Sequence, residues 1–252
     1  MNQLVKQFNE EGFLILKEFL STEDIQNIFD QVEAVFDQCM KNLGLKLENF
    51  KNVGEKYLYL KKHHPIMKSH CYDVLGRLDS VSYYMSSPRL TDLARAIYEM
   101  PLLLDGLQIR IDDPSNDRFL PLHQEVNQIS FLNVGCWIPL VDIPEIMGGL
   151  SIVPGSHKQG FLKQVYYPEL NNYHGLEPEV IASVKPMRVD IARGDALVFH
   201  PFLFHGPLPN RSQEIRWTMV GRYNELKSAL YLADEKADLA IPVEKYEPHC
   251  ID

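Results

Sequence analysis

Leu103-Leu-Asp-Gly-Leu-Gln-Ile-Arg-Ile111 decides the fold, because it opens a series of short β-type segments. Its second half alternates apolar with polar residues, so Gln108 and Arg110 share one face of an extended chain. A period of two is typical of a half-buried strand. The sequence therefore predicts a strand here, with two polar side chains together on one face.

Further β-type runs follow, separated by glycine, proline and asparagine. They cover residues 129–141, 150–153, 187–190, 196–199 and 217–223. Several short strands with turn signals between them indicate a sandwich or a jelly roll. We therefore expect a β core over residues 101–225.

The first hundred residues have a different character. A short apolar strand over 12–19 precedes Ser21, which we expect to cap a helix, with Asp24 completing a variant capping box. Apolar residues then recur at helical spacing, and a further helix is expected over 90–98. The prediction is a mainly β protein with flanking helices (α+β), in which N-terminal helices buttress the jelly roll.

We predict a single domain over residues 1–252. Residues 1–100 are mostly helical support, 101–225 form the jelly-roll core, and 226–252 form a C-terminal extension. The 252-residue chain is long enough to bury a core without disulfides or a structural metal.

Composition argues against several classes of protein. The net charge is −9 and no stripe of lysine or arginine is present, so no nucleic-acid partner is expected. No run of about 20 apolar residues exists, so no membrane span is expected. The start of the chain lacks the apolar segment of a secretory signal, and the four cysteines form no CxxC pair. We expect a cytoplasmic protein with free thiols that acts on a small molecule; the sequence gives no oligomeric state.

His123 and Glu125 lie two residues apart in Pro121-Leu-His-Gln-Glu125. On an extended segment both side chains leave the same face, with Cα atoms roughly 6.6 Å apart. They can therefore converge on one ion, although a His-x-Glu pair alone is a weak signal. The alternative is an exposed polar loop.

A second histidine has to come from elsewhere in the chain, and His200 and His205 both follow an apolar run. Two histidines and one carboxylate on one face of an octahedron leave three positions open, the pattern of iron(II) oxygenases. Arg216 follows His205 by eleven residues, at the start of the next apolar strand. In a hairpin it returns beside the metal, where its fork matches the distal carboxylate of a 2-oxo acid. This spacing favours His205 over His200; the alternative for Arg216 is a surface salt bridge with Glu214.

These motifs resemble those of the phytanoyl-CoA dioxygenase family of iron(II)/2-oxoglutarate oxygenases, over nearly the whole chain. The segments that carry the likeness are Gly12-Phe-Leu-Ile-Leu-Lys-Glu-Phe-Leu-Ser21, His123-Gln-Glu125, Trp137-Ile-Pro-Leu-Val-Asp142, Gly148-Gly-Leu-Ser-Ile-Val-Pro-Gly-Ser-His-Lys158, Gly194-Asp195, His205-Gly206, Pro209-Asn-Arg-Ser212 and Arg216. The resemblance implies a double-stranded β-helix and Fe(II) held by His123, Glu125 and His205. It also implies 2-oxoglutarate and O2 as co-substrates, with Arg216 clamping the far carboxylate of 2-oxoglutarate.

Two positions depart from the family pattern. Glu125 stands where the family usually has aspartate, and Pro207 stands where it tends to have a serine that helps to hold the co-substrate. Proline has no such donor. We therefore expect Gln108 and Arg110 to contact the co-substrate, the alternative being the polar face of a half-buried strand.

The expected reaction is hydroxylation of a small metabolite or natural product, and the sequence does not name the substrate. Two other functions remain open: a jelly-roll metal-binding or sensing protein without turnover, and a cupin-like metal enzyme that does not use 2-oxoglutarate. Weak candidates for substrate contacts are Tyr166, Tyr167, Tyr173, Asn127 and Gln128. For His157 a structural or supporting role is favoured over substrate contact.

Overall fold

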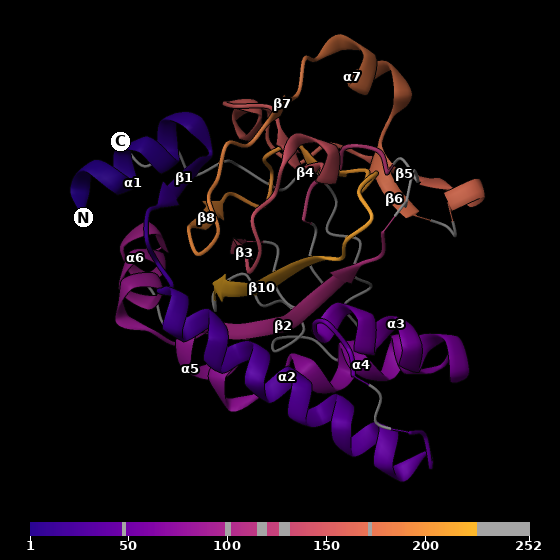
Figure 1. Cartoon of the computed structure of the whole chain (residues 1–252). Coiled ribbons are helices and arrows are strands. Elements are labelled where there is room, and N and C mark those ends of the chain that lie inside the picture. Colours follow the sequence, from indigo (N-terminus) through magenta and orange to yellow (C-terminus); the bar gives the residue numbers. More distant parts are fainter. Residues whose placement is uncertain (47–48, 99–101, 115–119, 126–131, 171–172, 226–252) are drawn as a thin grey trace, which may run out of the picture.

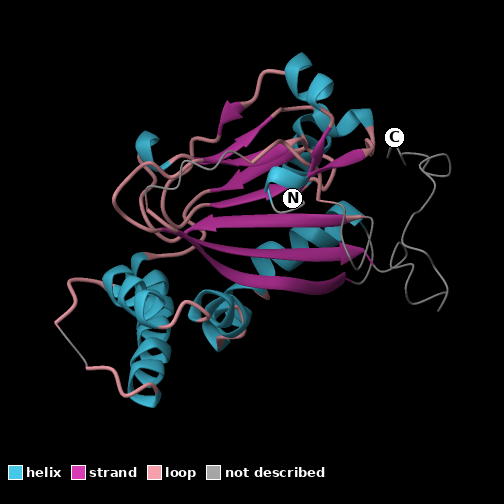
Figure 2. Ribbon diagram, turned by 90° about the vertical axis from the view of Figure 1, so that its right-hand side faces the viewer, coloured by secondary structure: helices cyan, strands magenta, loops and turns pink. Residues whose placement is uncertain are grey.

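The computed structural model describes residues 1–46, 49–98, 102–114, 120–125, 132–170 and 173–225. Its larger sheet has five antiparallel strands in the order β1 (Phe13–Leu16), β8 (Ala196–Phe199), β3 (Asn133–Pro139), β10 (Arg216–Glu225) and β2 (Leu102–Asp112). A smaller sheet has the order β7 (Met187–Arg188), β4 (Gly149–Ile152) and β9 (His205–Leu208). Strands β5 (Gln164–Tyr167) and β6 (Tyr173–Leu176) pair as a hairpin. Antiparallel strands stacked in layers form the predicted jelly-roll core (Figure 2).

Helices cover the face of the larger sheet that points away from the smaller one (Figure 1). They are α1 (Asn2–Glu11), α2 (Thr22–Asn42), α3 (Val53–His63), α4 (Met67–Leu75), α5 (Asp79–Met85) and α6 (Pro88–Tyr98), with α1 beside β1 and α2 to α5 beneath β2. A short helix α7 (Pro178–Ser183) and three 3₁₀ turns, η1 (Glu145–Met147), η2 (Ser156–Gln159) and η3 (Pro168–Leu170), lie in the connections. None of the helices in the described residues is both long enough and apolar enough to cross a bilayer.

The period of two in the strands divides the interior into two apolar layers. Along β3, Val134, Cys136 and Ile138 face the helices and belong to the main core. Trp137 points the opposite way, into the layer between the two sheets. On β10 the alternation is the same, and Trp217 packs among aromatic side chains of α2 and α3. The larger sheet is therefore buried on both faces, which explains why β3 is buried at every position.

A β-bulge interrupts the pairing of β10 with β2. Val220 lies opposite Gln108, but Arg222 lies opposite Asp105, so β2 carries one extra residue. Gly106 takes up the kink at φ 61°, a conformation that glycine adopts without strain. Bulges of this kind redirect the strand that carries the extra residue, and this one brings Gly106 next to Nη1 of Arg222.

The predicted elements and the observed ones agree closely. Ser21 and Asp24 form the capping box, and the helix expected over 90–98 is α6. Each predicted strand is present, except that residues 129–131 of the run 129–141 lie outside the described residues. The prediction missed β5, β6 and β9 and did not resolve where α3, α4 and α5 begin and end. The C-terminal extension also lies outside the described residues, and the single-domain assignment stays a prediction.

Candidate functional site

The two histidines of the proposed triad lie directly opposite one another. His123 and His205 form an isolated antiparallel bridge with backbone N–H···O distances of 2.8 and 3.1 Å. Their rings contact each other at a centroid distance of 4.3 Å, with the ring planes tilted by 49°. Glu125, two residues on, donates its backbone N–H to the carbonyl of Pro201 at 2.8 Å. The extended backbone thus sends His123 and Glu125 to the same side, as the spacing predicts.

The ligand atoms of His123, Glu125 and His205 all lie within 4.8 Å of one another. Glu125 Oε1 is 3.5 Å from Nε2 of His205 and 4.0 Å from Nε2 of His123. Ligands about 2.1 Å from an ion and at right angles to one another are about 3.0 Å apart. After a small inward movement, the ligand atoms of these three side chains would be close enough together to bind one ion. Two imidazoles and one carboxylate fit a borderline divalent metal such as iron(II).

Each ligand has a partner that fixes its orientation. Nδ1 of His205 donates to the carbonyl of Leu203 at 2.9 Å, which leaves the lone pair on Nε2. Nδ1 of His123 lies 2.8 Å from the hydroxyl of Tyr173 on β6. Partners of this kind fix the imidazole tautomer and the angle of the ring. Tyr173, a weak candidate for substrate contact in the sequence, thus contacts a proposed metal ligand, and its contact with substrate stays a prediction.

Glu125 pairs with Arg222 on β10. Its Oε2 accepts a hydrogen bond from Nε of Arg222 at 2.9 Å and forms an ion pair with Nη2 at 2.8 Å. Arg222 is not among the site residues predicted from the sequence. A signal was available, because Arg222 is an even number of residues after Arg216 on one strand and so faces the same side.

Gln124, between the two ligands, points the opposite way and is buried. Its Nε2 donates to the carbonyls of Gly160 and Phe202, each at 2.8 Å, and its Oε1 accepts from the N–H of Leu162 at 2.8 Å. These three bonds fasten the His-x-Glu segment to the neighbouring loops. The sequence analysis also missed this residue, since a glutamine beside two ligands gives no local sign of burial.

Burial and charge set the protonation of the site for metal binding. Burial and the neighbouring His205 lower the pKa of His123 to about 3, so its imidazole is neutral at physiological pH. For Glu125, burial acts to raise the pKa, but the hydrogen bond with His205 and the charge of Arg222 outweigh it and hold the pKa well below its usual value. The site therefore presents neutral nitrogen and anionic oxygen, the forms that bind a metal.

A narrow cavity of about 50 Å³ adjoins the triad. Its polar lining includes the two predicted co-substrate contacts, Gln108 and Arg110, together with Arg222; its apolar lining includes Trp137, Leu150, Phe199 and Pro207. The volume is room for one or two water molecules, so a larger ligand requires lining side chains to move. Among the described residues, the guanidinium of Arg110 has no hydrogen-bond or ion-pair partner.

Arg216 is buried, so the surface salt bridge with Glu214 is not formed. Its Nε donates to Asp112 at 3.1 Å, and its Nη1 donates to the carbonyls of Met147 and Leu208, each at 2.8 Å. It does not line the cavity in this structure. On β10, Arg216 lies four residues before Val220, which lines the cavity, and it contacts the carbonyl of Leu208, next to the cavity-lining Pro207. Its role as a clamp stays a prediction.

His200, the rival ligand, lies outside the triad. Its Nδ1 accepts the N–H of Phe202 at 3.0 Å, and its ring packs against His157 at 5.1 Å. His157 in turn contacts the carbonyl of Asn9 at 3.0 Å, in keeping with the structural role favoured for it. Two of the substrate-contact candidates, Asn127 and Gln128, lie outside the described residues.

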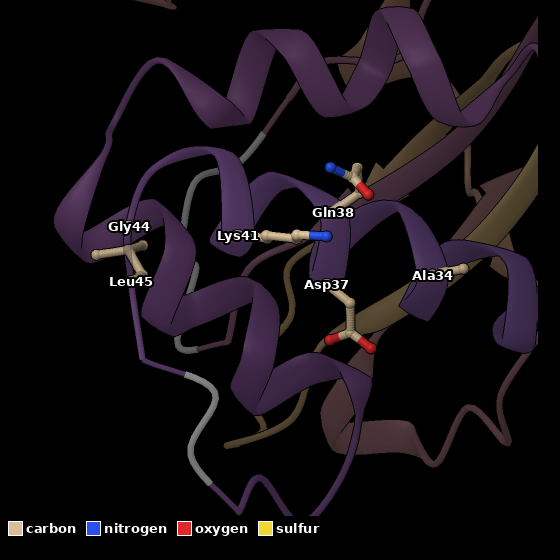
Figure 3. A pocket seen from close by; sticks show the side chains of 6 residues that line it. All are labelled: Ala34, Asp37, Gln38, Lys41, Gly44 and Leu45. Atoms are coloured by element: carbon tan, nitrogen blue, oxygen red, sulfur yellow. The ribbon is translucent and has the colours of Figure 1, made fainter.

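A wider hollow lies on α2 and the loop after it, away from the triad (Figure 3). Its lining is Ala34, Asp37, Gln38, Lys41, Gly44 and Leu45. Asp37 is already paired with Lys56 at 2.6 Å, and the lining contains no histidine or cysteine. This hollow therefore offers no cluster of reactive groups, and the candidate site is the triad cavity.

Comparison with known proteins gives one consistent family. Residues 8–218 match the family model for phytanoyl-CoA dioxygenase (PhyH). Rat peroxisomal phytanoyl-CoA dioxygenase is 25% identical over 231 residues, which cover 86% of this chain and 66% of the rat protein. Methylphosphonate hydroxylase of Gimesia maris is 22% identical over 93% of this chain and 86% of its own. The chain spans just under two thirds of the length of the phytanoyl-CoA dioxygenases that it matches in rat and human.

Solved structures show the same fold. The epimerase SnoN, in complex with Fe3+, alpha ketoglutarate and nogalamycin RO, superposes with a TM-score of 0.63 at 15% identity. The superposition covers 89% of this chain and 83% of SnoN. The family model spans the opening strand, both parts of the triad and Arg216. The chain belongs to the phytanoyl-CoA dioxygenase family.

Proposed function

We propose that this protein is an iron(II)- and 2-oxoglutarate-dependent dioxygenase that hydroxylates a small metabolite or natural product. The observation that carries the proposal is the convergence of His123, Glu125 and His205 at the wall of a cavity lined by arginines. Two imidazoles and one carboxylate on one side of an ion leave positions for a chelating 2-oxo acid and for O2. Family membership supports the assignment, and so does the presence of Fe3+ and alpha ketoglutarate in the SnoN complex.

Bound iron, 2-oxoglutarate and O2 would supply the oxidising chemistry. The protein's own part is to hold the metal, to orient the bound molecules and to exclude water. His123, Glu125 and His205 hold the metal. Trp137 and Phe199 give the cavity an apolar wall, which keeps water from the reacting groups.

We propose that Arg216 binds the distal carboxylate of 2-oxoglutarate, with Gln108 and Arg110 as further contacts. Gln108 and Arg110 already line the cavity, and the guanidinium of Arg110 is free among the described residues. Arg216 is held in a fixed orientation by Asp112 and two carbonyls, and its Nη2 is its one nitrogen without a partner in the described residues. Pro207 lines the same cavity and offers no donor, which leaves the arginines to bind the anion.

The decisive experiment measures succinate formation from 2-oxoglutarate by the iron-loaded protein, over a panel of small metabolites. We expect succinate and a hydroxylated product in equal amounts with the correct substrate. A protein that binds iron but forms no succinate with any compound would instead be a metal-binding or sensing protein. Turnover of a metabolite without 2-oxoglutarate would point to a cupin-like metal enzyme.

Matched arginine variants test the clamp. Arg216→Met should weaken 2-oxoglutarate binding by about 150- to 5,000-fold, because losing one side of a buried charged pair costs about 3–5 kcal/mol. Iron binding should change far less. Arg110→Met serves as the comparison: if it causes the larger loss and Arg216→Met causes none, Arg110 is the clamp. Titration of each cobalt-loaded variant with 2-oxoglutarate measures its affinity for 2-oxoglutarate.

For the substrate we propose only a broad chemical class, and for the location only a cellular compartment. Methylphosphonate hydroxylase is named for a small molecule, and SnoN forms a complex with the small molecule nogalamycin RO, which supports a small-molecule substrate here. We propose a cytoplasmic location, supported by the free thiols of Cys39, Cys71 and Cys136. The rat relative is named as peroxisomal, so fractionation of native cells is the appropriate test.

A further inference from the structure

Glu125 is longer by one methylene than the aspartate usual in the family, and the structure gives its two oxygens different partners. Oε1 faces the histidines, 3.5 Å from His205 and 4.0 Å from His123. Oε2 faces Arg222, accepts a hydrogen bond from its Nε at 2.9 Å and lies 2.8 Å from its Nη2 in an ion pair. Only one oxygen of the carboxylate is therefore directed toward the ion.

The backbone around Arg222 is shaped to hold its guanidinium in this place. The bulge between β2 and β10 sits immediately beside it, between Val220 and Arg222. Gly106, at the kink, lies under the guanidinium: a Cβ added there would come within 2.5 Å of Nη1 of Arg222. A side chain at position 106 would therefore push the arginine away from Glu125.

We propose that Arg222 is a positioning residue for the metal ligand Glu125. By binding Oε2 with two nitrogens, it keeps that oxygen away from the ion, so that Glu125 ligates through Oε1 alone. A carboxylate free to bind through both oxygens would take a coordination position that the co-substrates need. The longer glutamate side chain suits this arrangement, because it spans the distance between the ion and Arg222. The inference rests on the metal-binding part of the proposed function and does not require turnover.

The test is a double-mutant cycle on metal affinity, read from the visible absorption of bound cobalt(II). Arg222→Met should weaken cobalt binding about 10- to 100-fold, the usual effect of losing a group that orients a metal ligand. Glu125→Asp should also weaken it, because the shorter side chain cannot reach both partners. In the Glu125→Asp background, adding Arg222→Met should cost little more. Such non-additivity is what coupling between the two side chains predicts.

Two controls keep the result specific. Arg193→Met removes an exposed arginine, whose one side-chain bond in the described residues is to Thr22, and should leave cobalt binding unchanged. Arg222→Lys keeps the charge but not the paired nitrogens, so it should restore only part of the affinity, and it serves if Arg222→Met does not fold. Cobalt binding as tight as in the wild type after Arg222→Met, or additive losses in the double variant, would overturn the proposal. If the two substitutions are non-additive but the wild-type protein forms no succinate, Arg222 keeps its role as a positioning residue and the dioxygenase function is refuted.

Discussion

Single side chains decide whether this site binds a metal, and the two neighbouring histidines of one segment illustrate it. Nε2 of His205 faces Glu125, whereas His200 uses its Nδ1 to accept a backbone N–H and packs against His157. His205→Ala should therefore abolish binding of one iron(II) per chain, and His200→Ala should largely spare it. Metal analysis of the purified variants measures this. The opposite pattern would assign the ligand role to His200.

The carboxylate of Glu125 can be tested in the same way, this time for turnover. Glu125→Asp should keep measurable activity with weaker iron binding, because it keeps the charge and the oxygen ligand but shortens the reach by roughly 1.5 Å. Packed interiors resist a shift that would make up the difference. Glu125→Ala should lose nearly all activity. Native rates of 2-oxoglutarate turnover in Glu125→Ala would mean that the third ligand is another residue, of which Asp142 is the nearest alternative suggested by the sequence.

The neighbouring loops hold the His-x-Glu segment in place, and the side chain of Gln124 connects the segment to them. Gln124→Leu would remove the hydrogen bonds that the side chain of Gln124 forms with the carbonyls of Gly160 and Phe202 and with the N–H of Leu162. A fully buried group left unsatisfied costs about 1–3 kcal/mol, and two of these three bonds are only partly buried, so we expect a loss of about 2–5 kcal/mol in the free energy of unfolding. Denaturant unfolding measures it, with the exposed Gln26→Ala as the control. A change below about 0.5 kcal/mol would mean that these bonds do not stabilise the segment.

Local patterns in the sequence predict some elements well and others hardly at all. The capping residues Ser21 and Asp24 and the alternation around Gln108 and Arg110 are local signals, and the structure agrees with both. Strand β9 contains Gly206 and Pro207 and is a strand because it pairs with β4, which no local pattern encodes. The β5–β6 hairpin is largely half-buried or exposed and so lacks a clear apolar period. The pairing of Arg222 with Glu125 joins residues that are 97 positions apart in the chain, and no local pattern encodes it.

At the scale of the whole molecule, the buried His157 and the half-buried His200 join α1 to the jelly roll. His157 contacts the carbonyl of Asn9, His200 packs against Phe8, and the N–H of His200 donates to the carbonyl of Gly12 at 2.8 Å. Burial, reinforced by the mutual proximity of the rings, lowers the pKa of His200 to about 3, and burial also lowers the pKa of His157. Charged groups near His157 are Lys158, which lowers its pKa further, and Glu11, which opposes the shift.

This arrangement predicts a loss of stability in acid. Below the ordinary histidine pKa of about 6.5, the unfolded chain takes up protons that the folded chain excludes. The contribution of His200 to the free energy of unfolding is therefore complete above pH 6.5. It should fall by up to about 1.4 kcal/mol for each pH unit from there toward pH 3. His200→Asn removes the titrating group, so the stability difference between wild type and variant should shrink between pH 7 and pH 5. A difference that stays constant with pH would contradict the prediction.

The bridge between His123 and His205 joins strand β9 to a segment that is far from it in the chain. Their backbone hydrogen bonds set the spacing of the rings, so a metal ion meets a site whose nitrogens are already in place. A nascent chain that has not yet produced β9 lacks one of the two nitrogens and has no such site. Metal binding therefore requires that β9 has already paired with the segment around His123. Because the ion binds the closed form and not the open one, at one hundred times its dissociation constant it would add about 2.7 kcal/mol to the stability of the folded protein.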